Sequence, residues 1–405
     1  MKKLIGLALL GAVMLTGCAG AGVVDLPQST RIDREEVARL AQMTLLAAET
    51  AVGAQNDEIA VFHTRPDGTI VFNMWTQTDP DHPLSAGLLR FQQEVATRSN
   101  GELAVDIRVS AGNDGDSLNR VMNNQLDAAV ITVWSAWSGI NPLANLESLP
   151  FLFTNYDEAW RAYEGSLGQW VTDEIINPSG MVALGYWTNG LRHFTNNVRP
   201  IYTPNDLIGL RMRSMQTSTQ LETYATFGAA SISLPFGQVH GGLAAGDFDG
   251  QDNPLGNIYA AQLYEVQRYL SLSGHMYSSA PVIVSTDFWE SLSPAHRQIL
   301  IESSLYAGRY QGERTRAEYQ SQIAAMTAAG MMVNEVDIAA FEEAVIPVWT
   351  AHMAQFGNDM AIMASRYIAD PNALAHRFGD GMGYVAPEVD VEILEDEDED
   401  EELEG

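Results

Sequence analysis

The chain has 405 residues, of which 46% are apolar, so it is long enough for two domains with sizeable buried cores. Its formal net charge of −30 argues against a nucleic-acid-binding protein, because its 22 Lys and Arg residues are too few and too scattered to replace phosphate counterions. Twelve acidic residues lie in positions 388–405, so the remaining chain carries a milder excess of negative charge. A site for an anion in such a chain must be locally basic.

The first residues predict a targeting segment rather than part of the fold. Lys2 and Lys3 precede the apolar run Leu4–Met14, which is shorter than the roughly 20 residues of a membrane-spanning helix. Leu15-Thr16-Gly17-Cys18 then resembles a bacterial lipobox, whose cysteine is acylated and becomes the first residue of the mature chain. The alternative is an ordinary secretory signal with an incidental cysteine. Cys18 is the only cysteine, so the chain cannot form an internal disulfide.

A tether and an accessory helix are expected between the signal and the main fold. Residues 19–29 are small and polar, and Asp33-Arg-Glu-Glu36 has the pattern of a capping box before apolar residues at helical spacing. A spacer, a self-association helix and a pad on the first domain all remain open for this segment. A packed or solvated accessory helix is the simplest interpretation.

The next part of the chain alternates strands and helices. Strands are predicted at Thr69–Trp75, Leu103–Val109 and Asp127–Val133, with helices at Ala86–Ser99 and Val121–Gln125 between them. This order predicts right-handed crossovers and a parallel sheet, with ligands at the carboxyl ends of the strands.

Aromatic and histidine side chains follow those strands. Trp75, Trp134 and His82 stand at or just beyond predicted strand ends, where each would line a pocket or pack in the core or a lid. The two tryptophans are the better candidates for a binding site, and Phe236, after a later strand, is a further one.

The second half of the chain repeats the alternation. Strands are predicted at Val182–Trp187, Gly209–Met215, Ser231–Leu234, Pro281–Ser285 and Met332–Val336, and helices at Ser218–Phe227, Phe236–Ala245 and Ile338–Met360. A short strand should end at Asp249–Pro254, and Tyr264–Ser273 should then form an extended segment. Two crossings, near Thr188–Gly190 and His275–Ser279, divide two interleaved α/β lobes by a hinge. A long helix should begin at Ser293-Pro294 and continue to Gly330, about 50 Å at 1.5 Å per residue.

Two arginines and an amide occupy strand-like surroundings in this half. Arg192 and Arg213 are rigid forks of N–H donors that match a carboxylate, and Asn253 lies in a turn between Asp249 and Pro254. Brought together on adjacent strand ends, these groups would bind a small organic anion. Each could instead be a surface or interlobe residue in an ion pair, and Arg211 fits a solvated charge better.

Four motifs in a fixed order carry a family resemblance. They are Gly190-x-Arg192, Asp206-Leu-x-Gly-Leu-Arg-Met-Arg213, Asp249-Gly-Gln-Asp-Asn-Pro254 and Tyr264-Glu-Val-Gln-Arg-Tyr269. Together they resemble the solute-binding proteins of TRAP transporters, the DctP-like periplasmic receptors for C4-dicarboxylates, sialic acid, uronates and related acids. The resemblance covers roughly Thr69 to Tyr384.

The resemblance implies an α/β, two-lobe periplasmic-binding-protein-like fold with a long helix that spans both lobes. It implies that Arg213 grips the ligand carboxylate bidentately, that Arg192 approaches or orders the site, and that Asn253 completes it. The ligand is then a small mono- or dicarboxylic acid, the partner is a TRAP membrane permease driven by ion gradients, and no catalysis or cofactor is expected. The expected location is the periplasm or another extracytoplasmic space, with the chain anchored to the membrane through lipid on Cys18.

The implied domain boundaries follow from the crossings. Residues 1–17 are the signal peptide and 18–66 the lipidated cysteine, tether and accessory helix. Lobe I comprises 67–189 and 279–318, lobe II comprises 190–278 and 319–385, and 386–405 form a disordered acidic tail.

Departures from the family pattern leave the rest of the ligand open. Gly237-Gln-Val-His240 and Gln251-Asp-Asn-Pro254 replace common family residues at positions that shape the non-carboxylate part of the pocket. Asp252-Asn253 favours the branch without a metal beside the ligand. The scattered histidines and the missing His-Glu-x-x-His and Gly-x-Ser-x-Gly patterns give no support to zinc or serine chemistry. Two other functions remain open, a ligand-binding module for a sensor and an extracellular enzyme acting on acidic metabolites.

Overall fold

The computed structural model describes residues 61–352. The predicted signal peptide, Cys18, the accessory helix, the acidic tail and the end of the helix predicted at Ile338–Met360 lie outside the described residues.

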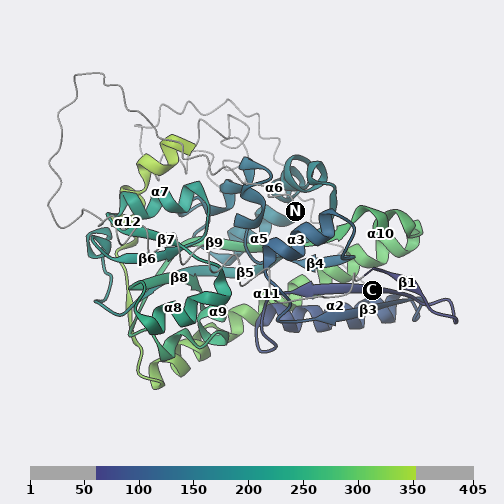
Figure 1. Cartoon of the computed structure of the whole chain (residues 1–405), viewed down its shortest axis with the longest axis horizontal. Coiled ribbons are helices and arrows are strands. Elements are labelled where there is room, and N and C mark those ends of the chain that lie inside the picture. Colours follow the sequence, from purple (N-terminus) through teal and green to yellow (C-terminus); the bar gives the residue numbers. More distant parts are fainter. Residues whose placement is uncertain (1–60, 353–405) are drawn as a thin grey trace, which may run out of the picture. The chain divides into compact units, whose positions relative to one another are not determined.

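A ten-stranded sheet forms the centre of the described part (Figure 1). Its main order is β1-β2-β4-β9-β5-β8-β6-β7, with β3 added on β2 and β10 on β9. The strands are β1 (His63–Thr64), β2 (Ile70–Thr76), β3 (Leu103–Arg108), β4 (Ala128–Val130), β5 (Met181–Asn196), β6 (Arg211–Ser214), β7 (Ala230–Ser233), β8 (Gly250–Pro254), β9 (Tyr269–Ser285) and β10 (Met332–Glu335).

Two groups of parallel strands flank the middle of the sheet. In one group β2 pairs in parallel with both β3 and β4, as the alternation of strands and helices predicts. In the other group β6 pairs in parallel with β7 and β8. In parallel sheets ligands usually bind beyond the carboxyl ends of the strands, so the loops after the parallel strands of each group are where site residues are sought.

Two long antiparallel strands, β5 and β9, connect the groups. They have 16 and 17 residues and pair along most of their length, with register shifts near Gly185, Gly190 and Arg192. The sequence predicted the short strands Val182–Trp187 and Pro281–Ser285 and the extended segment Tyr264–Ser273 here, with crossings at Thr188–Gly190 and His275–Ser279. Those crossings lie inside the paired ribbon, where Thr188 faces Ser279 and Gly190 faces Ser278.

Glycine is required at the register shift of β5 near Gly190. Gly190 has φ +134°, and a Cβ there would lie 3.2 Å from the Cβ of Pro254 and 3.3 Å from the hydroxyl of Tyr156. A residue with a side chain would be both strained and crowded at this position. The glycine therefore allows the register shift between Thr188 and Gly190, two residues before Arg192.

Helices cover the strands of each group. They are α2 (Pro83–Arg98), α3 (Asp114–Met122), α4 (Ser135–Ser138), α5 (Tyr156–Glu164), α6 (Ser166–Val171), α7 (Ser218–Thr226), α8 (Val239–Ala245), α9 (Leu255–Ala260), α10 (Thr286–Ser291), α11 (Pro294–Ala328) and α12 (Ile338–Ala344). Short turns of other helix types are η2 (Pro142–Ser148), η3 (Thr172–Ile176), η4 (Asn177–Ser179), η5 (Pro204–Leu207), η6 (Phe236–Gln238) and η7 (Leu263–Glu265).

The long helix predicted from Ser293-Pro294 is confirmed as α11, which has 35 residues. Ser293 caps it by accepting a hydrogen bond from His296 N, and Pro294 is its first residue. Its N-terminal half packs on α2 and β5, and later residues pack near α9 and β10. Leu300 and Ala307 belong to the core under β2 and β3, whereas Met326 belongs to the core around α8 and α9. One helix thus contacts both strand groups.

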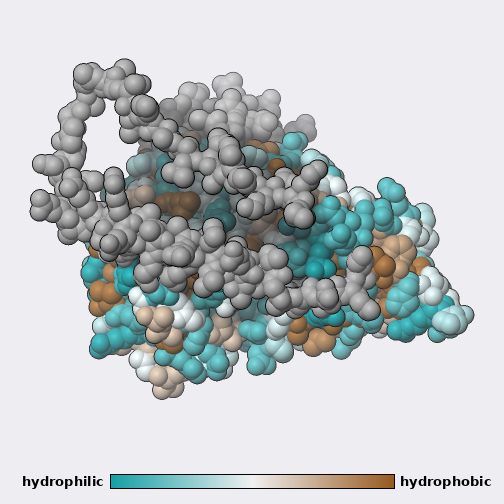
Figure 2. Space-filling view, in the orientation of Figure 1, coloured by the Kyte–Doolittle hydropathy of each residue, from teal (hydrophilic) through white to brown (hydrophobic). Residues whose placement is uncertain are grey.

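The visible surface of the described residues in Figure 2 is a mixture of hydrophilic and hydrophobic side chains. Exposed apolar side chains such as Leu89, Ile208 and Met332 are dispersed along the chain. No helix within residues 61–352 is long and apolar enough to cross a membrane.

Candidate functional site

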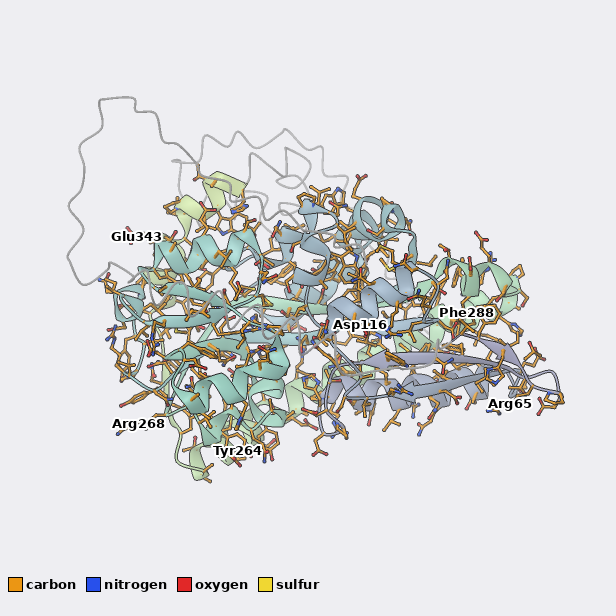
Figure 3. The ribbon with its side chains drawn as sticks, viewed as in Figure 1. Arg65, Asp116, Tyr264, Arg268, Phe288 and Glu343 are labelled. Atoms are coloured by element: carbon orange, nitrogen blue, oxygen red, sulfur yellow. The ribbon has the colours of Figure 1, made fainter. Side chains whose placement is uncertain are left out.

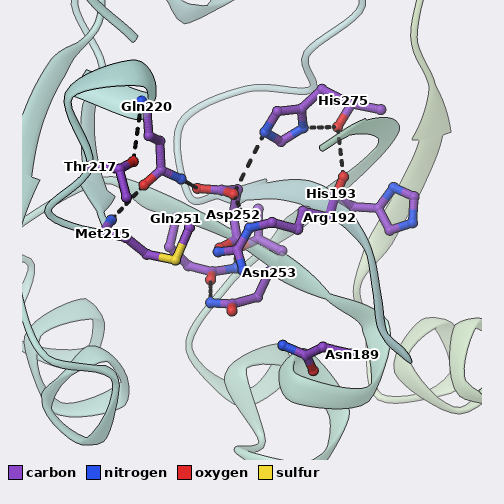
Figure 4. Close-up of polar contacts among 12 residues, drawn as sticks. Asn189, Arg192, His193, Met215, Thr217, Gln220, Gln251, Asp252, Asn253 and His275 are labelled. Carbon is purple, nitrogen blue, oxygen red and sulfur yellow. Dashed lines mark hydrogen bonds and ion pairs between the residues drawn. The ribbon is translucent and has the colours of Figure 1, made fainter. Parts of the chain in front are cut away.

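A buried network around Asp252 lies where β5, β8 and β9 meet (Figure 4). Arg192 Nε donates to Asp252 Oδ2 at 2.5 Å, and Arg192 Nη2 donates to the backbone carbonyl of Asp252. Gln220 and Tyr224, both on α7, donate to Oδ1 at 2.9 and 2.5 Å. His275 Nε2 lies 3.6 Å from Oδ2. Arg192 and Asp252 are both completely buried.

The charge of Arg192 keeps Asp252 ionised. Burial by itself would raise the pKa of Asp252, but the adjacent Arg192 guanidinium and the hydrogen bonds from His275 and Tyr224 outweigh it and hold that pKa well below its ordinary value. The pKa of His275 is lowered, mainly by burial. His275 also stacks on Phe194 with the ring centroids 4.0 Å apart. The charge of Arg192 is therefore already neutralised inside the protein.

Arg213 has different surroundings at the end of β6. Its Nε donates to the carbonyl of Leu234 at 2.8 Å, which holds the guanidinium against the residue that follows β7. Among the described residues, no carboxylate forms an ion pair with it, and neither terminal nitrogen has a hydrogen-bond partner. Burial, followed by repulsion from nearby Arg192, lowers the pKa of Arg213 to about 10, so it remains a cation at neutral pH.

Arg213 lines a cavity of about 320 Å³ between the two strand groups. This volume is at the lower end of the roughly 300–1,000 Å³ found for small-molecule sites. One wall comes from the β6 and β7 side and the other from loops after β2, β3 and β4. The lining residues are Gln77, Asn113, Asp114, Gly115, Val133, Ser135, Ala136, Arg213, Met215, Gln216, Leu234, Pro235 and Phe236.

Asp114 faces the cavity from the first turn of α3. Its Oδ2 accepts hydrogen bonds from Gln77 Nε2 at 2.8 Å and from the amide and hydroxyl of Thr132, both at 2.7 Å. Burial raises the pKa of Asp114 to about 7, against the opposing effect of the Thr132 hydrogen bonds. In Figure 3 the neighbouring Asp116 marks this helix near the middle of the view, between Phe288 and Arg65 at one end and Tyr264 and Glu343 at the other.

The other residues predicted for the site lie in several places. Phe236 lines the cavity beside Arg213. Asn253 is buried on β8, and its amide nitrogen donates to Gln251 Oε1, one residue from Asp252. Neither Asn253 nor Arg192 is among the residues that line the cavity. The structure therefore brings Arg213 and Phe236 to the cavity, whereas Arg192 and Asn253 are buried outside its lining.

Both predicted tryptophans are buried in the core instead of lining this cavity. Trp75 lies under Arg108 and Arg120, whose guanidinium carbons are 4.8 and 5.4 Å from its rings. Trp134 donates from its indole nitrogen to the hydroxyl of Ser279 at 2.9 Å, next to Trp137.

His82 does not line the cavity beside Arg213. It caps α2 by accepting a hydrogen bond from Leu84 N, while its Nε2 lies 2.8 Å from Asn257 Oδ1 on α9. Burial lowers the pKa of His82 to about 4, so the ring is neutral at pH 7. This contact joins a helix of one strand group to a helix of the other.

Sequence reasoning missed the polar wall opposite Arg213. Gln77, Asn113, Asp114 and Ser135 follow the ends of β2, β3 and β4, which is the edge that the parallel order predicted for ligands. The sequence analysis placed the helix after β3 at Val121–Gln125, whereas α3 begins at Asp114 with Asn113 as its cap. The signal that could have found this wall is Asn113-Asp114-Gly115 itself, a capping pattern after a strand. Within residues 61–352 no group of three or more His, Cys, Asp or Glu side chains is arranged to hold a metal ion.

Comparison with known proteins identifies the family. The model of the bacterial extracellular solute-binding protein family 7, DctP, matches residues 74–355. The chain belongs to this family. It is 30% identical over 276 residues to the 2,3-diketo-L-gulonate-binding periplasmic protein YiaO of Escherichia coli K12, over 67% of this chain and 82% of that protein. It is 28% identical over 261 residues to the sialic acid-binding periplasmic protein SiaP of Vibrio cholerae, over 64% and 81% of the two chains.

Solved DctP-family structures have the same fold. A TRAP periplasmic solute-binding protein from Polaromonas sp. JS666, solved with bound D-erythronate, matches with a TM-score of 0.70 and 27% identity over 74% of this chain and 98% of that one. The α/β two-lobe fold and the DctP resemblance expected from the motifs are thereby confirmed.

Proposed function

We propose that this DctP-family chain is the extracytoplasmic receptor of a TRAP-type transporter and that Arg213 captures the carboxylate of a small organic acid. The observation that carries the proposal is the Arg213 guanidinium, a buried cation in the wall of a small cavity with both terminal nitrogens available. A carboxylate accepts two parallel N–H bonds from such a fork, and a desolvated site strengthens each of them. The relatives support this ligand class, because YiaO is named for 2,3-diketo-L-gulonate and the Polaromonas protein holds D-erythronate.

Arg192 and Asn253 act indirectly in this proposal. Arg192 holds Asp252 and thereby fixes β8 beside β5. Asn253 orders the same strand through Gln251. Trp75 and Trp134 are buried in the core and support the loops that follow β2 and β4.

The ligand class is tested by a thermal-shift screen of organic acids followed by calorimetry. D-erythronate, D-glucuronate, D-galacturonate and succinate are suitable first probes, since a ligand at a hundred times its Kd adds about 2.7 kcal/mol to the free energy of unfolding. Absence of any shift across the acids would contradict the receptor function.

Arg213→Ala tests the role of Arg213. Removing one partner of a buried charged pair costs at least about 2 kcal/mol, so affinity for the acid found in the screen should fall at least about thirtyfold while the chain stays folded. Arg211→Ala is the matched control, because Arg211 lies on the same strand but pairs with Asp249 at 2.7 Å and does not line the cavity. An unchanged Kd in Arg213→Ala would remove Arg213 from the site.

The partner and the anchor are also proposed. A TRAP permease would accept the ligand-bound receptor, by analogy with the family. The lipobox-like Leu15-Thr16-Gly17-Cys18 supports a lipid on Cys18 that keeps the receptor at the membrane. Radiolabelled fatty acid should then label the wild-type chain in cells but not Cys18→Ser, and equal labelling would contradict the anchor.

A further inference from the structure

On the side of the sheet where α11 packs, each strand group has its own apolar core. Leu84 of α2 belongs to one core and Ile258 of α9 to the other. On the opposite side, a continuous core contains both Trp75 and Tyr224 and so reaches both groups. The helices α2 and α9 therefore share none of the cores formed by the described residues.

A buried hydrogen bond joins these two helices instead. His82 Nε2 lies 2.8 Å from Asn257 Oδ1, and the two residues are only 3% and 5% exposed. In a neutral imidazole one nitrogen carries the proton and the other accepts. Because His82 Nδ1 accepts from Leu84 N, Nε2 carries the proton and donates to Asn257. Each partner therefore has the atom that the other requires.

Glycine at the start of α9 allows this close approach. A Cβ at Gly256 would lie 3.2 Å from His82 Nε2 and 3.4 Å from Pro83 Cδ. The two helices meet at their N-terminal ends, which follow the carboxyl ends of β2 and β8. The contact thus lies where the two strand groups face each other.

The contact is close to the proposed site but is not part of its wall. Neither His82 nor Asn257 lines the cavity that contains Arg213. Gln77 and Phe236 line that cavity and also a void of about 10 Å³ beside the contact, which is too small for an organic acid. A ligand on Arg213 is therefore separated from the His82–Asn257 bond.

We propose that the His82–Asn257 bond is a latch that holds the two strand groups together when an acid occupies the cavity. The bond requires α2 and α9 to be in contact, so a hinge motion that parts the two groups breaks it. Stabilising the closed arrangement raises the affinity for every ligand that it encloses. The latch rests on the proposed function, and it names two residues that control binding without touching the ligand.

Two single variants break the latch from opposite sides. Asn257→Ala removes the acceptor, whereas His82→Asn keeps a good cap for α2 on a side chain too short to reach Asn257. Calorimetry on the full chain would measure D-erythronate, D-glucuronate and succinate. Each variant should raise the Kd of every acid that binds by about two- to tenfold, the effect of one hydrogen bond, and by a similar factor for each acid. The double variant should bind no more weakly than the weaker single variant, because both changes remove the same bond.

Asn197→Ala is the matched control. The Asn197 side chain donates to Val266 O and accepts from Arg268 N, so its hydrogen bonds lie on the same side of the boundary as α9. This variant should keep the wild-type Kd for each acid.

Spin-label distances report the closed arrangement directly. Cys18 is the only cysteine, so a Cys18→Ser chain can carry labels at Leu89→Cys on α2 and Ala244→Cys on α8, both exposed positions. The fraction of short distances should fall in Asn257→Ala and His82→Asn, with and without acid, and should not fall in Asn197→Ala.

Each other outcome has a definite meaning. An unchanged Kd in a folded single variant, or additive losses in the double variant, overturns the latch. A loss confined to one acid assigns the residue to that ligand and overturns the latch as well. If none of the three acids binds the wild-type chain, the proposed function fails, and the label distances without acid still decide the latch, since equal short-distance fractions overturn it. If one single variant does not fold, the other decides.

Discussion

Two arginines that lie close together in this fold have different surroundings, and those surroundings decide what each can do. Arg192 faces Asp252 in the interior and is completely buried. Arg213 faces a cavity, and the only hydrogen bond of its side chain to the described residues goes to the Leu234 carbonyl. The guanidinium of Arg192 is therefore a structural ion-pair partner, whereas that of Arg213 is a candidate ligand-binding group. Residue type and spacing alone predicted an equal role for both.

Asp252→Asn should strongly destabilise the fold. The substitution removes the negative partner of Arg192 and leaves a buried guanidinium uncompensated, which typically costs about 3–5 kcal/mol. Urea unfolding of the variant should show a loss of that size in the free energy of unfolding.

The control is a surface ion pair of the same chemistry. Glu318→Gln breaks the Arg314–Glu318 pair on α11, whose side chains are 41% and 28% exposed, and should cost less than about 1 kcal/mol. Equal losses in the two variants would show that Asp252 is not what stabilises the buried charge of Arg192.

At the scale of elements, sequence patterns predicted the regular strands and the long helix but not the central ribbon. Apolar runs such as those of β2 and β4 are typical of buried strands, and a capped proline marked the start of α11. By contrast, the middle of β9 contains Ser271, Ser273, Gly274 and His275, which are poor strand formers. Ser271 pairs with Phe194 of β5, and Ser273, Gly274 and His275 lie in the register irregularity between that pair and Arg192–Met276. β9 continues through them because β5 pairs with it on both sides, a tertiary effect that local pattern does not carry.

The candidate site shows the same limit. The parallel order of β2, β3 and β4 predicted the edge where a ligand binds, and motif resemblance singled out Arg213. Which of two arginines faces the cavity depends on the long-range pairing of Arg192 with Asp252, 60 positions apart. The role of Asp114 depends on Thr132 and Gln77, which come from other loops. Contacts of this kind become visible only when the chain is folded.

At the scale of the whole molecule, buried titratable groups make the free energy of unfolding depend on pH. Buried carboxyl groups and buried histidines change it in opposite directions. Burial raises the pKa of Glu147 from 4.5 to about 8 and that of Asp114 from 3.8 to about 7. The folded chain then holds protons that the unfolded chain has released, so stability falls as pH rises through these ranges. Burial lowers the pKa of His82 from 6.5 to about 4, so the unfolded chain holds the proton more tightly and stability rises with pH between these two values. Above about pH 6.5 this contribution of His82 to stability is fully present. Among these three groups, Glu147 therefore contributes most to the change in the free energy of unfolding between pH 7 and 8.

Glu147→Gln should flatten this upper part of the profile. The glutamine keeps an oxygen for the Ser279 amide, which donates to Glu147 Oε1, but it no longer titrates. The wild-type chain should lose stability on the order of 1 kcal/mol per pH unit between pH 7 and 8, and the variant should lose clearly less. Urea midpoints at pH 6.5, 7, 7.5 and 8 measure both slopes. Glu265→Gln, at an exposed position, should keep the wild-type slope; if Glu147→Gln keeps it too, a different group controls the alkaline loss of stability.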